Sequence, residues 1–187
     1  MSTRCDDIQP LFVANTAFGP WDGDKWEAYK RWSGLNRLDE LVSLDRILCP
    51  LVSTRQDNID WQDQDVDDGA RDYIADVDCL IADTADVEHR NILCVFCNPT
   101  EKVAAPLAQH QFQLFGYDLV DRRGHVSALS NGGGFPDAFD KDELTHNGLI
   151  GSCKRALRIQ AHLRERYPDE PHADCDVWAI FRAELTH

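Results

Sequence analysis

The segment NILCVFCNP, residues 91–99, constrains the fold more than any other stretch of this sequence. Its central residues 92–97 are apolar at consecutive positions, so both faces of an extended chain would have to be covered. The Asn98-Pro99 pair that follows is typical of a strand end, because proline cannot donate a hydrogen bond to a neighbouring strand. The pattern predicts a central β-strand that is buried on both faces.

The rest of the chain predicts helices first and strands later. Apolar residues at helical spacing predict helices within residues 21–36, 65–81 and 152–167. Residues 37–52 are also expected to be helical, although their later half fits an extended chain equally well. Further strands are expected in residues 112–129, as a hairpin that turns at residues 122–124, and in residues 175–185. The glycine-rich residues 130–148 are expected to form a loop.

These elements predict an α+β fold, with a mainly antiparallel sheet of about four strands. The N-terminal helices and one late helix are expected to pack on this sheet. A chain of 187 residues fits one domain over 1–187, with a helical N-terminal part, 20–82, and a sheet-containing part, 90–187.

The net charge of −14 is concentrated in one stretch. Residues 57–88 hold twelve acidic residues and one basic residue, a net −11 that leaves only −3 for the rest of the chain. A coherent negative surface predicts a basic protein partner, and argues against nucleic acid and anionic membranes as ligands. The residues expected to bind the partner are Asp60, Trp61, Asp63, Asp65, Asp68 and Asp72.

Two structural alternatives explain the same acidic stretch. Carboxylates near position 65 are favourable at the start of the helix expected there, because the helix dipole is positive at that end. The late helix carries Lys154, Arg155, Arg158, Arg164 and Arg166 against Glu165, so the acids could instead be neutralised inside the molecule.

Patterns that suggest metal or nucleotide binding fail on spacing. In DQDVDDG, residues 63–69, the glycine is one position late for a calcium loop and Ile74 stands where the closing glutamate belongs. Cys94 and Cys97 have a zinc-like spacing with His172 and Cys175, but a regular strand would point the first two to opposite faces. The acids after NGGGF, residues 131–135, oppose phosphate binding. We therefore expect no cofactor and no metal.

A catalytic alternative rests on PHADCDVW, residues 171–178, which brings His172, Asp174 and Cys175 close in sequence. His125 or His146 would have to complete such a site, and no established catalytic motif supports it. The seven scattered cysteines and the absence of a secretory signal predict reduced thiols and a cytoplasmic location.

The sequence thus favours an acidic protein-binding domain rather than an enzyme. One interpretation is an inhibitor or immunity-type protein that neutralises a basic partner such as a nuclease. A small hydrolase- or transferase-like enzyme that uses the His172–Cys175 region and an accessory domain with an unknown ligand stay open as alternatives. The sequence carries no signal for the oligomeric state.

Overall fold

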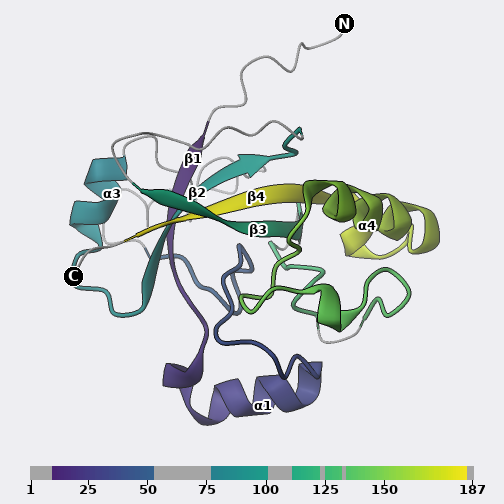
Figure 1. The fold of residues 1–187 in the computed structure, drawn as a ribbon, viewed down its shortest axis with the longest axis horizontal. Helices are drawn as coiled ribbons and strands as arrows, with labels where there is room; N and C mark the ends of the chain where they lie inside the picture. Colours follow the sequence, from purple (N-terminus) through teal and green to yellow (C-terminus); the bar gives the residue numbers. More distant parts are fainter. Residues whose placement is uncertain (1–9, 53–76, 101–110, 123–124, 132–133, 185–187) are drawn as a thin grey trace, which may run out of the picture.

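Four strands form one antiparallel sheet in the computed structural model, which describes residues 10–52, 77–100, 111–122, 125–131 and 134–184. The strands are β1 (Leu11–Thr16), β2 (Arg90–Cys97), β3 (Phe112–Asp121) and β4 (Cys175–Ala183). Their order across the sheet is β1-β2-β4-β3, so β2 and β4 occupy the centre (Figure 1). This sheet confirms the predicted α+β class.

The strand predicted for residues 91–99 is confirmed as β2, whose residues from Asn91 to Phe96 are all buried. The predicted C-terminal strand is confirmed as β4. The hairpin prediction is half wrong, because residues 125–129 do not form a strand and only Ser127 makes an isolated bridge, to Val120. The strand missing from the sequence prediction is β1, an apolar LFVANT segment that pairs with β2 along its whole length.

Three helices accompany the sheet in the described part of the chain. They are α1 (Asp24–Ser33), α3 (Val77–Asp83) and α4 (Cys153–Arg166). The predictions of helices in 21–36 and 152–167 are confirmed, whereas residues 65–76 of the third predicted helix lie outside the described residues. The helix predicted over 37–52 is wrong, because these residues run as an irregular segment with isolated bridges to β1 and its flank.

Both faces of the sheet are covered, as the predicted burial of β2 requires. The face that carries Cys94 and Val177 packs against α4, whose Ile159 and Leu163 are fully buried. On the other face, Leu93 and its neighbours pack against the irregular segment 41–51 and Leu149. No helix of the described residues belongs to this second layer, so its shape depends on how side chains hold that segment in place. None of the described helices has the length and apolar character needed to cross a membrane.

Candidate functional site

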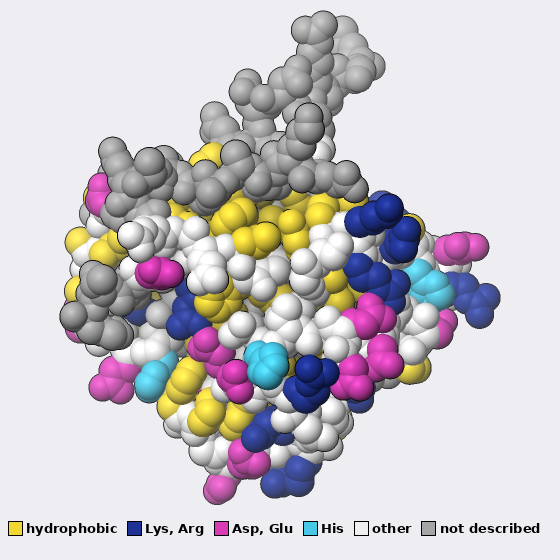
Figure 2. Space-filling view, viewed as in Figure 1, with side chains coloured by type: hydrophobic (Ala, Val, Ile, Leu, Met, Phe, Trp, Pro, Cys, Tyr) yellow, Lys and Arg dark blue, Asp and Glu magenta, His cyan; other side chains and the backbone are white. Residues whose placement is uncertain are grey.

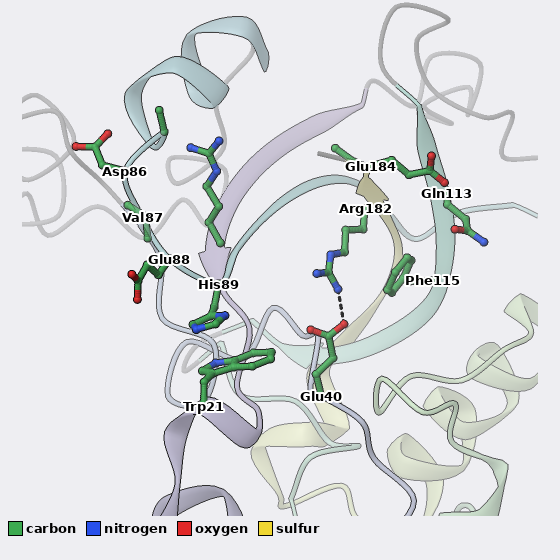
Figure 3. A pocket seen from close by; sticks show the side chains of 13 residues that line it. Trp21, Glu40, Asp86, Val87, Glu88, His89, Gln113, Phe115, Arg182 and Glu184 are labelled. Atoms are coloured by element: carbon green, nitrogen blue, oxygen red, sulfur yellow. Dashed lines mark hydrogen bonds and ion pairs between the residues drawn. The ribbon is translucent and has the colours of Figure 1, made fainter. Parts of the chain in front are cut away.

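A broad hollow of about 850 Å³ opens where β3 begins and β4 ends. The loop between α3 and β2, residues 84–89, forms its opposite side (Figure 3). An ion pair between Arg182 and Glu40 lies between the two sides, and the Arg182 guanidinium stands over the Phe115 ring at 5.3 Å. Glu40 also accepts a hydrogen bond from Asn147 at 3.2 Å. The charges in the middle of the hollow therefore cancel each other.

The rim of this hollow is negative. Asp86, Glu88 and Glu184 are exposed there, and none of the ion pairs between described residues engages them. Arg90, the other basic residue of the lining, donates hydrogen bonds of 3.3 Å to the Ile81 carbonyl and the Thr84 hydroxyl at the end of α3. In Figure 3 the carboxylates of Asp86 and Glu88 point outward, away from the ion pair. We call this feature the carboxylate-rimmed hollow.

A fixed aromatic pair borders the hollow. The rings of Trp21 and His89 are stacked, with centroids 4.3 Å apart and planes 6° apart. The Trp21 indole N–H donates to the Ala17 carbonyl at 3.0 Å, and the ring lies so close over Gly19 that a Cβ there would sit 2.8 Å from it. His89 has a φ of 54°, a left-handed conformation that side chains adopt at some energetic cost. These contacts hold the pair in one position. Trp21 is nevertheless 41% exposed, so the pair still faces solvent.

A second hollow of about 510 Å³ lies on the flank of the same pair, since Trp21, Glu88 and His89 line both. Much of its lining is apolar and includes Phe18, Leu48 and the exposed Ile47. The Ile47 side chain is 73% exposed at the border of this hollow. We call this feature the apolar hollow.

A buried hydrogen-bond network positions the segment that carries Ile47. One carboxylate oxygen of Asp45 accepts from the backbone N–H groups of Ile47 and Leu48, at 2.9 and 3.1 Å. Its other oxygen accepts from the Ser127 N–H at 3.0 Å and from the Ser130 hydroxyl at 2.8 Å. Asp45 is 2% exposed, so these bonds form out of contact with bulk water, where they are strongest.

Asp118 on β3 completes this network. It is fully buried and accepts from the hydroxyls of Ser43 and Ser127 at 2.6 and 2.5 Å, and from the Leu44 N–H at 3.1 Å. Burial raises the pKa of Asp118, and the hydrogen bonds from Ser127, Ser43 and Leu44 oppose that shift. The carboxylate thus ties the irregular segment and the 127–130 loop to the same strand.

The residues predicted to bind a partner, Asp60, Trp61, Asp63, Asp65, Asp68 and Asp72, all lie outside the described residues. The described end of the same acidic stretch supplies Asp86 and Glu88 to the carboxylate-rimmed hollow. The sequence reasoning missed Trp21, His89 and Ile47. The sequence does contain an indication for Trp21, because Gly19-Pro20 directly before it predicts a tight turn. That turn places the Trp21 side chain outside the helix that follows.

The basic helix α4 pairs with a different acidic segment in the described part of the chain. Arg155 donates to Glu143 at 2.8 Å, and His162 lies 3.0 Å from Asp137. Lys and Arg side chains gather toward the α4 end of the molecule with carboxylates beside them (Figure 2), whereas α3 lies at the opposite end (Figure 1). The described acids of residues 77–88 are therefore not neutralised by α4.

The candidate catalytic residues are packed in different ways. Cys175 is fully buried, and burial raises the pKa of its thiol to about 12, whereas a nucleophilic cysteine needs a lowered pKa. His172 is also buried against Phe135, and its Nε2 has no hydrogen-bond partner in the part of the chain that the structure describes. Asp174 is exposed and lies 3.4 Å from Arg122.

The two further histidines lie in other surroundings. His125 is half-buried, and burial is the main cause that lowers its pKa. His146 is exposed beside Asp39 at 3.2 Å.

The two cysteines of the zinc pattern, Cys94 and Cys97, also lie in different surroundings. Cys94 is buried among the core side chains on the α4 face of the sheet, and Cys97 lies at the end of β2 near Asp176. Among the described residues, no group of three or more His, Cys, Asp or Glu side chains is arranged to hold a metal ion.

Comparisons of this chain with models of known protein families, with curated proteins and with solved structures found no match.

Proposed function

We propose that this chain is an acidic protein-binding domain whose partner presents a basic surface. The observation that carries the proposal is the negative rim of the carboxylate-rimmed hollow, beside a rigid and exposed Trp21. Unpaired carboxylates attract a basic partner over distances of about 10 Å at moderate salt, and so raise the association rate. An exposed, fixed tryptophan then supplies apolar contact area at little entropic cost.

The charge distribution supports the same proposal. The described acids of residues 77–88 lie at the end of the molecule opposite α4, and two side chains of α4, Arg155 and His162, pair with residues 137–143 instead. An inhibitor or immunity-type role against a basic protein such as a nuclease is the specific form that we propose. A row of carboxylates can occupy the cationic groove of such a partner.

The enzyme alternative has weaker support. The thiol of Cys175 is buried, and its pKa is raised rather than lowered. Among the described residues, Nε2 of His172 has no hydrogen-bond partner to orient or activate. The neighbourhood of these residues therefore has the properties of a packed core.

The test is a pull-down from the native host with the full chain as bait, at low and at moderate salt. We expect one basic protein to be captured, and its capture to weaken as the salt concentration rises. The double variant Asp86→Lys, Glu88→Lys should lose that protein, because it reverses the charge of one side of the rim. The control is Glu165→Lys on α4, an exposed position far from the rim, which should retain it. Salt-independent capture, or equal loss in the variant and the control, would contradict the proposal.

A further inference from the structure

We infer that the partner binds through a short extended segment in which a basic and a large apolar side chain lie on either side of the Trp21–His89 stack. This inference rests on the proposed function and specifies the chemistry of the partner at the same surface. It depends on the fact that two hollows of different character share one aromatic border.

The carboxylate-rimmed hollow selects the basic side chain. Its central ion pair is internally balanced. The three carboxylates of the rim outnumber the one remaining cation of the lining, Arg90, so the net charge that a ligand meets is negative. Glu88 lies beside the aromatic pair and lines both hollows. An arginine at this rim can pair with Glu88, because its planar guanidinium can donate two parallel hydrogen bonds to one carboxylate. Arginine therefore fits this position better than lysine.

The apolar hollow selects the second side chain. Ile47 contributes an exposed apolar surface, and Phe18 and Leu48 are half-buried behind it. The hydrogen bonds from Ile47 and Leu48 to Asp45 hold this surface in place before any partner arrives. A large aliphatic or aromatic side chain placed there would remove apolar area from water on both partners, which favours binding.

The stack between the hollows sets the spacing of the two side chains. An extended chain advances about 3.3 Å per residue, so crossing a pair of stacked rings takes about two to four residues. The expected segment therefore has an arginine and a large apolar residue two to four positions apart. Because Trp21 is fixed by the Ala17 carbonyl and by contact with Gly19, little side-chain entropy is lost when the segment packs on it.

The probe that tests this inference is a displayed library of random heptapeptides, with the full chain as bait. We expect selection to enrich peptides in which arginine and a leucine, isoleucine or phenylalanine lie two to four positions apart. Replacing the arginine of a selected peptide with citrulline, which removes the charge at nearly constant shape, should weaken binding at least tenfold. Enrichment of basic peptides without the apolar residue, or enrichment of no peptide, would overturn the inference.

Protein variants locate the site. Trp21→Ala and Ile47→Ser should each weaken a selected peptide at least fivefold, and Trp21→Ala more than Ile47→Ser. The matched controls are Trp32→Ala and Leu157→Ser, whose side chains are 62% and 38% exposed and line neither hollow. Ile47→Ser also guards against misfolding as the cause, because a residue that is 73% exposed contributes little to the core. Equal weakening in the controls, or none in the two variants, would overturn the inference.

The same variants separate this inference from the proposed function. If Asp86→Lys, Glu88→Lys loses the basic protein from the host while Trp21→Ala and Ile47→Ser retain it, the proposed function stands and the inference fails. If all three retain it, both fail.

Discussion

Replacing Asp118 with asparagine should cost the folded protein about 2–4 kcal/mol, because the site supplies only donors to that side chain. One oxygen accepts from the Ser127 hydroxyl at 2.5 Å and from the Leu119 N–H at 2.8 Å. The other accepts from the Ser43 hydroxyl at 2.6 Å and the Leu44 N–H at 3.1 Å. Asparagine has nearly the same shape but offers one acceptor oxygen and one amino group. Its amino group, which is a donor, must therefore face one of the two pairs of donors.

The size of the stability loss depends on which of these donors can reorient. A serine hydroxyl can rotate, but the N–H groups of Leu44 and Leu119 are fixed by the backbone, so one of them is left unpaired. A buried unpaired donor costs about 1–3 kcal/mol, and the hydrogen bonds lost or weakened among the remaining donors add about 1 kcal/mol. The opposing effect is relief of the burial that raises the pKa of Asp118, since asparagine carries no charge to desolvate. We expect the lost hydrogen bonds to outweigh that relief.

Urea unfolding followed by tryptophan fluorescence measures the difference, and the fully buried Trp26 makes the signal sensitive to loss of the core. The midpoint should fall with an unchanged slope, and the thermal midpoint should fall by about 4–16 °C for a chain of this size. The control is Asp142→Asn, because that side chain is 79% exposed and its ion pair with Arg37 is 3.6 Å long. It should change stability by less than about 0.5 kcal/mol. Asp118→Asn stability equal to or above that of the unmodified protein would refute the reasoning.

Three further predictions concern the thiols, the sheet and the pH dependence of stability. In the folded protein at pH 7, iodoacetamide should leave Cys175 unmodified, as peptide mass spectrometry would show, because burial raises the pKa of its thiol to about 12; fast labelling would favour the enzyme alternative. Gly116→Ala should lower stability by more than about 2 kcal/mol in urea unfolding, because φ is 149° and the new Cβ would lie 2.9 Å from the Ile150 carbonyl oxygen. Gly151→Ala, which meets only a side-chain carbon at 3.9 Å, should change stability little, and equal effects would contradict the steric argument. Burial lowers the pKa of His172, so the unfolded chain takes up the proton first as pH falls below about 6.5, and this part of the stability is lost toward acid pH. His172→Phe should reduce the loss between pH 7.5 and 5.0 in urea unfolding, and an unchanged loss would show that His172 does not contribute.

The central part of the fold could be predicted from the sequence because its signals are local. An apolar run of six residues specifies β2, and helical spacing with charged outward positions specifies α4. The strand β1 has a comparable apolar core in LFVA, but it is short and precedes the helical pattern, so nothing local indicates that it pairs with β2. Strand pairing between residues 11 and 95 depends on the whole fold, and sequence periodicity does not contain it.

The second strand of the expected hairpin failed for a different reason. Residues 125–129 have the composition of a strand, but Ser127 donates its hydroxyl and its backbone N–H to two buried carboxylates. Two backbone hydrogen bonds with β3 flank Ser127, from Ala128 to Leu119 and from Asp121 to Val126, and the pairing is limited to the Val120–Ser127 bridge. The carboxylate of Asp45, 82 residues away, thus helps to hold this segment in its irregular conformation.

The same carboxylates explain why the helix predicted for 37–52 does not form and why the candidate site was missed. Asp45 takes the N–H groups of Ile47 and Leu48, Asp118 takes that of Leu44, and the N–H of Val42 bonds to the Asn147 carbonyl. In a helix, each of these N–H groups would bond to the carbonyl four residues earlier. Because they bond elsewhere, the segment is irregular, and its apolar residues lie partly in the core and partly on the surface. Val42 and Leu44 are buried under the sheet, while Ile47 is left in solvent beside Trp21. The hydrogen bonds that prevent the helix therefore also hold the apolar hollow in its shape. A variant that weakens them should lower both the affinity for the partner and the stability of the fold.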